Sequence, residues 1–97
     1  MNTLPNQPLF SLGQVVVTQG ISALLAIPGN TTDLRLLIAQ HIKGQWGGVS
    51  DGDKQSNEQA LMQGGRLMSA YQLADERILI ITEADRSATT VLLPSEY

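Results

Sequence analysis

The Gly64-Gly65 pair divides this chain of 97 residues into a longer N-terminal part and a shorter C-terminal part with different hydrophobic patterns. Before the pair, apolar residues recur at the three- and four-residue spacing of amphipathic helices. After it, three short runs rich in β-branched and large apolar residues are separated by the turn-forming segments Ala-Asp-Glu and Ala-Asp-Arg-Ser. The sequence therefore predicts an α+β domain, in which N-terminal helices pack on an antiparallel sheet of three or four strands that ends in a C-terminal meander.

The individual elements can be placed from their end signals. A β-branched triplet between Gly13 and Gly20 predicts a short buried strand over residues 13–18. Helices are expected over residues 19–27, from a cap at Thr31 or Thr32 to Lys43, and over residues 53–63. The meander strands are expected over residues 66–73, 77–83 and 88–93. The glycine-rich stretch between the second and third helices predicts a loop anchored by Trp46.

The length fits one hydrophobic core, so we expect a single domain over residues 11–97. Residues 1–10 contain two prolines and are predicted to form an extended arm. The chain has no 18-residue apolar run and no cationic segment followed by an apolar one, so we expect a cytoplasmic protein that does not enter a membrane.

Composition excludes several classes of function. The chain has no cysteine, which rules out disulfides, thiolate metal sites and cysteine nucleophiles. Six basic residues and a net charge of −3 argue against a basic nucleic-acid clamp. Phosphate-binding glycine motifs are missing, and the Asp51-Gly52-Asp53 start of a calcium-like loop has Met62 where a glutamate ligand is needed. We therefore expect no cofactor and no metal ion.

Two residues near the second helix allow both a functional and a structural interpretation. His41 is the only histidine, and it could act as a general acid or base, or bond a carbonyl at the helix end. Trp46 could stack on a base or fill the edge of the core. The structural interpretation is favoured for both.

The stretch over residues 81–90 combines acidic, basic and hydroxyl side chains around a turn. In the structural interpretation, Asp85 forms an Asx turn and Arg86 pairs with Glu83 or Asp85. A functional reading places arginines and hydroxyls on a sheet face opposite His41, where they could cleave RNA with His41 as the acid or base. The catalytic candidates are His41, Arg66, Arg86 and Thr89, and the binding candidates are Trp46, Asn57, Ser69, Tyr71, Asp85 and Thr90.

Several blocks of the sequence resemble a family of short proteins carried on plasmids and integrative elements. The blocks are residues 12–16, His41-x-x-Gly44-x-Trp46-Gly47, residues 57–61, residues 65–71 and the C-terminal ITEADRSATTVLLPSEY. The family pattern Gly-Asp-Trp-Gly-Asp has Gln45 and Gly48 in place of its aspartates here. The resemblance implies no activity. A second analogy, to small ribonucleases of the barnase and RelE type, rests on the order of elements alone.

The leading hypothesis is an accessory protein of a plasmid or mobile element that acts by binding an unknown protein partner, through surface acids such as Asp75, Glu76 and Asp85. The alternative is a small metal-independent ribonuclease, whose partner would be RNA. A DNA-binding regulator is a third reading, which the acidic balance disfavours. Homodimerisation through the edges of the meander is a further expectation, because an open sheet has unpaired edges.

Overall fold

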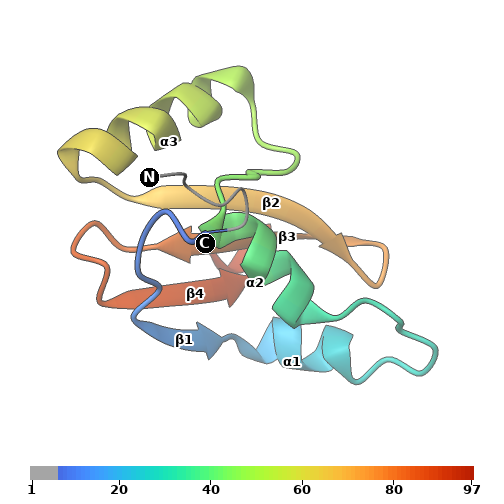
Figure 1. Cartoon of the computed structure of the whole chain (residues 1–97). Coiled ribbons are helices and arrows are strands. Elements are labelled where there is room, and N and C mark those ends of the chain that lie inside the picture. Colours follow the sequence, from blue (N-terminus) through green and yellow to red (C-terminus); the bar gives the residue numbers. More distant parts are fainter. Residues whose placement is uncertain (1–6) are drawn as a thin grey trace.

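A computed structural model describes residues 7–97 and confirms the α+β class (Figure 1). The elements, in chain order, are β1 (Gln14–Val17), α1 (Gln19–Leu25), α2 (Leu34–Ile42), α3 (Asp51–Gln63), β2 (Leu67–Leu73), β3 (Glu76–Thr82), β4 (Ala88–Leu92) and a short 3-10 turn, η1 (Pro94–Glu96). Most of the predicted N-terminal arm, residues 1–6, lies outside the described residues.

The four strands form one sheet in the order β1-β4-β3-β2. Strands β2, β3 and β4 are the expected antiparallel meander. Strand β1 pairs with β4 in parallel, with Val15 opposite Thr89 and Val17 opposite Val91. The prediction of a wholly antiparallel sheet was therefore wrong, because β1 joins the far side of the meander and runs in the same direction as the last strand.

Strand β1 also corrects the expectation of a buried strand. All four of its residues are exposed, and the side chains of Val15, Val16 and Val17 retain 41%, 40% and 41% of their accessible surface. The β-branched triplet does form a strand, but its place at the end of the strand order leaves one of its sides without a neighbour.

The N-terminus of α2 differs from the prediction in its capping residue. The cap is Asp33 rather than Thr31 or Thr32, and its carboxylate accepts a hydrogen bond from the backbone N–H of Arg35 at 2.9 Å. The Arg35 guanidinium also pairs with this carboxylate, and these hydrogen bonds lower the pKa of Asp33. An acidic cap favours the helix start because it accepts an otherwise unpaired N–H and complements the helix dipole.

The other two helices start with hydroxyl caps. Thr18 caps α1 by accepting from the N–H of Ile21, as expected, although the helix ends at Leu25 rather than at residue 27. Ser50 caps α3 by accepting from the N–H of Asp53 at 3.1 Å, so this helix begins two residues earlier than predicted. The element boundaries thus follow the capping side chains more closely than the hydrophobic pattern.

The helices cover different parts of the sheet. In Figure 1, α2 crosses one face of the sheet, α1 continues from the end of β1, and α3 lies beyond β2. The first buried cluster joins α1 to the sheet and comprises Ile21, Leu24, Tyr71, Leu73, Ile78, Ile80 and Val91. The second comprises Trp46, Val49, Ala60, Leu67, Ala70, Leu79, Ile81 and Leu92. No helix within residues 7–97 has the length and apolar character needed to span a membrane.

Candidate functional site

The single histidine lies at the centre of a buried polar network. His41 Nδ1 is 2.5 Å from Ser69 Oγ, and Nε2 is 2.9 Å from Thr82 Oγ1. Thr82 Oγ1 is in turn 2.7 Å from Thr89 Oγ1, and the Thr89 hydroxyl donates to the carbonyl of Leu12 at 2.8 Å. Because these partners come from β2, β3, β4 and the segment before β1, the network connects three strands and that segment through one side chain of α2.

The number of protons in the network determines the direction of each hydrogen bond. A hydroxyl has one proton to donate, and a carbonyl oxygen can only accept. Thr89 donates to the carbonyl, so Thr82 must donate to Thr89 and must accept from His41 Nε2. Nδ1 is then the acceptor for the hydroxyl of Ser69. His41 is therefore a neutral imidazole with its proton on Nε2, and both of its nitrogens are occupied.

Aromatic packing completes the enclosure of His41. The ring of Phe10 meets the imidazole edge-on at a centroid distance of 5.2 Å, and the ring of Trp46 lies at 5.9 Å. The His41 side chain has no accessible surface, and burial lowers its pKa from 6.5 to about 4. The predicted bond from His41 to a carbonyl at the helix end is replaced by the two hydroxyl contacts. This geometry suits a structural histidine, since a general acid or base must reach its substrate.

Arg86 binds backbone carbonyls rather than a carboxylate. Its Nη1 donates to the carbonyls of Gly65, Glu83 and Ala84 at 2.5, 3.1 and 3.2 Å, and its Nη2 donates to the carbonyl of Ala60 at 3.0 Å. The expected ion pair with an acidic side chain is therefore not formed. A guanidinium has five donors in a rigid fork, which allows it to hold the end of α3 against the β3–β4 turn.

The other charged candidates lie on the surface near that turn. Asp85 forms the predicted Asx turn, accepting from the N–H of Ser87 at 2.9 Å, and hydrogen bonds from Ser87 lower its pKa. Arg66 donates to the hydroxyl of Tyr97 at 2.9 Å and lies 3.7 Å from the carboxylate of Glu83. Arg66 is half exposed, so this ion pair contributes little to stability.

Trp46 and Tyr71 are held by polar contacts at their ends. Trp46 is buried at the edge of the core, as the structural interpretation predicted, and its Nε1 donates to the carboxylate of Glu58 at 3.1 Å. The Tyr71 hydroxyl donates to the backbone carbonyl of Gln45, and burial raises the pKa of Tyr71. Both aromatic rings therefore anchor the glycine-rich loop to the sheet, and neither offers a free face for stacking on a base.

The structure brings together only part of the predicted catalytic and binding candidates. Ser69 and Thr89 join His41 in the buried network, as their shared sheet face requires. Thr90 follows Thr89 in the strand, so its side chain points to the opposite face. Arg86 lies over the ring of Phe10, with its Cζ 5.8 Å from the ring centroid, and its donors are directed to carbonyls rather than to His41.

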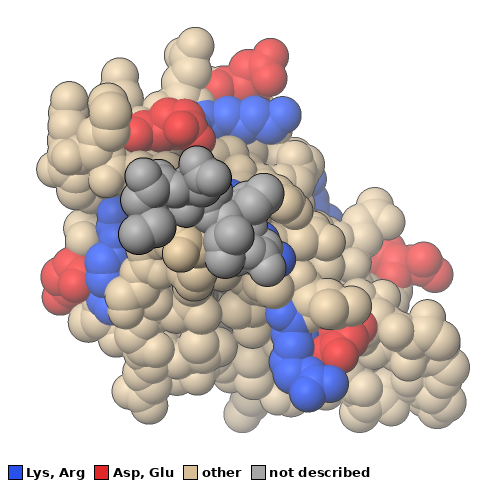
Figure 2. Space-filling model, in the orientation of Figure 1, with Lys and Arg blue, Asp and Glu red and all other residues tan. Residues whose placement is uncertain are grey.

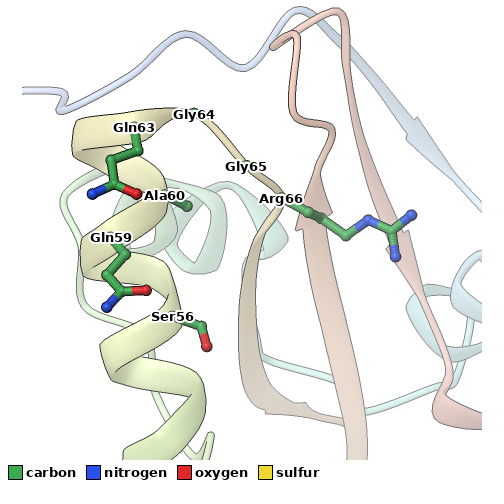
Figure 3. A pocket seen from close by; sticks show the side chains of 7 residues that line it. All are labelled: Ser56, Gln59, Ala60, Gln63, Gly64, Gly65 and Arg66. Carbon is green, nitrogen blue, oxygen red and sulfur yellow. The ribbon is translucent and has the colours of Figure 1, made fainter.

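The described residues form two prominent surface hollows, and neither gathers the candidate residues. The first, of about 270 Å³, is lined by Ser56, Gln59, Ala60, Gln63, Gly64, Gly65 and Arg66. Figure 3 shows that the Arg66 side chain points away from α3. The polar side chains that α3 contributes to this hollow, those of Ser56, Gln59 and Gln63, are uncharged. The second, of about 340 Å³, is lined by Leu37, Gly47, Gly48, Ala70, Tyr71, Gln72 and Arg77. Among residues 7–97, no three histidine or acidic side chains are arranged to hold a metal ion.

The two outer strands of the sheet differ in how their free sides are covered. The Asn57 side chain forms two hydrogen bonds with the backbone of Met68, on the side of β2 that faces away from β3. Farther along β2, the N–H of Ala70 donates to the carbonyl of Trp46 at 3.1 Å, and its carbonyl accepts from the N–H of Gly48 at 2.8 Å. The outer side of β2 is therefore largely paired.

The outer side of β1 is open within the described part of the chain. The N–H of Gln14 donates to the carbonyl of Ser87, just before β4, at 3.0 Å, and that of Thr18 donates to the carbonyl of Val91 in β4 at 3.1 Å. In a parallel ladder alternate residues bond to the same neighbour, so the N–H and C=O groups of Val15 and Val17 point outward. We call Gln14–Val17, with these two outward residues, the β1 edge.

The β1 edge lies in an uncharged part of the chain. No Asp, Glu, Lys or Arg precedes Asp33 in the sequence. In Figure 2, which has the orientation of Figure 1, the lower left of the molecule, where β1 lies, shows no acidic or basic side chain. Sequence reasoning did not select the three valines as binding residues, although this uncharged stretch around a β-branched triplet was a signal.

Comparisons with known proteins assign no family, because no family model, no curated protein and no solved structure matches the chain. The resemblance to plasmid-borne proteins therefore stays a prediction. The function has to be argued from the geometry of this chain alone.

Proposed function

We propose that this chain is a non-catalytic accessory protein of a plasmid or mobile element, and that it works by binding a protein strand along the β1 edge. The supporting observation is the contrast between the covered side of β2 and the open side of β1. Proteins normally protect an exposed edge strand with lysine, proline or a bulge, or cover it with another segment. Strand β1 contains neither lysine nor proline, and its exposed side chains are mostly valine.

The environment of the histidine supports a non-catalytic role. A metal-independent ribonuclease needs an imidazole that reaches the ribose hydroxyl and cations that reach the phosphate. Here the imidazole is enclosed, and the Arg86 guanidinium is engaged by four carbonyls. The contacts that the imidazole and the guanidinium make inside the fold account for both side chains without catalysis.

The surface acids are a weaker candidate for the binding surface than the β1 edge. Asp75 lies in the turn between β2 and β3, whereas Asp85 lies in the turn between β3 and β4. Successive turns of an antiparallel meander lie at opposite ends of the sheet, so these two acids cannot form one contact surface.

Site-specific photocrosslinking tests the binding surface. A photoreactive amino acid would replace Val16 in the full chain, produced in its native cells, and the same residue would replace Leu36 in a matched control. Leu36 is an exposed apolar residue of α2, 63% exposed, and lies outside the proposed surface. We expect crosslinks to a protein chain from position 16 that exceed those from position 36 several-fold. Equal or absent crosslinking at the two positions would contradict the proposal.

An RNA cleavage assay tests the absence of catalysis. Purified protein would be incubated with labelled mixed-sequence RNA in EDTA, and the products separated on a denaturing gel. We expect the RNA to remain intact. Cleavage that co-purifies with the wild-type chain and disappears in a folded Ser69→Ala variant would support the ribonuclease alternative instead, because Ser69 bonds to the imidazole.

A further inference from the structure

We propose that the strand that pairs with the β1 edge is β1 of a second copy of this chain, in a two-fold antiparallel arrangement. This inference rests on the proposed role of the β1 edge in binding a strand. It joins two four-stranded sheets into one continuous sheet of eight strands.

The spacing of the outward groups fits this symmetry. In an antiparallel pair of strands, two residues that face each other at a hydrogen-bonded position exchange both of their N–H···O=C hydrogen bonds. The outward residues of β1 are Val15 and Val17, one on each side of Val16. A two-fold axis through Val16 places Val15 of each copy opposite Val17 of the other. Every outward N–H and C=O group of these two residues then has a partner.

The side chains are compatible with the same register. Two Val16 side chains meet across the axis on one face of the sheet, and on the other face each Val15 meets a Val17. β-Branched residues that face each other across strands pack well. All of these side chains are partly exposed in the single chain, so pairing buries apolar surface.

Charge favours a second copy at this edge over other parts of the surface. The chain carries a net charge of −3, so two copies repel each other unless they meet where charge is lacking. The β1 edge lies within such a region. The carboxylates with contacts near β1 lie beyond its two ends: that of Glu96 accepts from Thr18 and Gly20, and that of Asp85 accepts from Ser87, whose carbonyl accepts from Gln14. In the two-fold register Thr18 lies opposite uncharged Gln14 of the second copy.

The pairing involves only four residues per chain, so we expect a dimer whose population depends on concentration. Sedimentation of the purified full chain over a wide concentration range measures this equilibrium. We expect a shift from monomer to dimer as the concentration rises. A chain that remains monomeric at millimolar concentration would overturn the inference.

Charge exchange at Val16 tests the axis itself. Val16→Lys and Val16→Glu each bring like charges together across the two-fold axis, so each variant alone should dimerise at least roughly tenfold more weakly than the wild type. An equimolar mixture of the two should recover dimer, because lysine then faces glutamate. Leu36→Lys, made at an exposed apolar site on α2 outside the β1 edge, should leave the dimer unchanged. Failure of the mixture to recover dimer would contradict a contact between the two Val16 positions.

Amide hydrogen exchange tests the register independently of any substitution. The N–H groups of Val15 and Val17 point outward, whereas that of Val16 points toward β4. We expect exchange at Val15 and Val17 to slow with rising protein concentration, while exchange at Val16 is already slow. Dimerisation that leaves both outward amides exchanging rapidly would show that another surface associates.

Failure of the dimer and failure of the proposed function give different results. A monomeric purified chain that still crosslinks to a different protein from position 16 would contradict the second copy as the occupant, but would leave the β1 edge as the binding surface. No association in solution and no crosslink from position 16 would contradict both.

Discussion

The side chain of Asn57, on α3, pairs with the backbone of Met68, on β2, as a neighbouring strand would. Its Nδ2 donates to the Met68 carbonyl at 2.8 Å, and its Oδ1 accepts from the Met68 N–H at 3.0 Å. An amide side chain has the same kinds of donor and acceptor as a peptide group, so the Asn57 side chain can take the place of a neighbouring strand. The helix thus covers one edge of the sheet, whereas the opposite edge, at β1, is open within the described residues.

Replacing Asn57 with leucine should destabilise the fold by about 2 kcal/mol, because it leaves a backbone donor and acceptor of Met68 without partners. The free energy of unfolding in urea measures this effect. Ser56→Ala on the exposed side of α3 is the matched control and should change stability little. Equal effects of the two substitutions would show that the paired hydrogen bonds contribute nothing.

The buried imidazole predicts a pH dependence of stability. The pKa of His41 is about 4 in the folded chain and about 6.5 in the unfolded chain, so only the unfolded chain takes up this proton between these values. Stability should therefore fall as the pH drops from 6.5 toward 4, by about 3 kcal/mol in total from this group. Unfolding at several pH values measures it, and NMR should show the single histidine still neutral at pH 5.5. A histidine that titrates near pH 6.5 would contradict the enclosed network.

The carbonyl cluster around Arg86 predicts that lysine cannot replace this arginine. Arg86→Lys keeps the charge but loses the planar fork that reaches both Ala60 and Gly65, so we expect a loss of about 2 kcal/mol in stability. Arg35→Lys is the control, because Arg35 is an exposed partner of Asp33, and it should change stability little. Thermal unfolding compares the two variants, and an unchanged transition in Arg86→Lys would argue against the role of the fork.

Two glycines should respond in opposite ways to alanine. Gly47 has φ +71°, and an added Cβ would overlap the carbonyl oxygen of Ala70 in the segment that covers β2. Gly47→Ala should therefore destabilise the chain by more than about 2 kcal/mol. Gly52 lies in α3 with open space around it, and Gly52→Ala should stabilise the chain by up to about 1 kcal/mol. Chemical denaturation measures both, and a stable Gly47→Ala variant would contradict the close contact between the loop and β2.

Local sequence signals correctly predicted the kinds of element and several details. The runs of β-branched and large apolar residues after Gly65 predicted the meander, and helices were correctly expected in the regions of α1, α2 and α3. The Asx turn at Asp85 was predicted from the properties of that side chain alone. These features depend on backbone preferences and hydrogen bonds within a few residues, which a sequence records directly.

The candidate site depended on contacts that no local pattern specifies. His41 and Arg86 each satisfy buried polar groups from segments far apart in the chain, and the sequence shows only that such residues are present. The sequence therefore allowed both a catalytic and a structural interpretation of these residues, with the structural one favoured, until their partners were known.

The sequence by itself determined that residues 14–17 form a strand, since three β-branched residues in a row favour an extended backbone. Only the tertiary structure decided that this strand lies at an open edge, parallel to β4, while α3 and the loop before it cover β2. Strand propensity arises within a residue and its neighbours, but the choice of pairing partner depends on the packing of the whole chain. An exposed and an enclosed strand can therefore have the same local sequence.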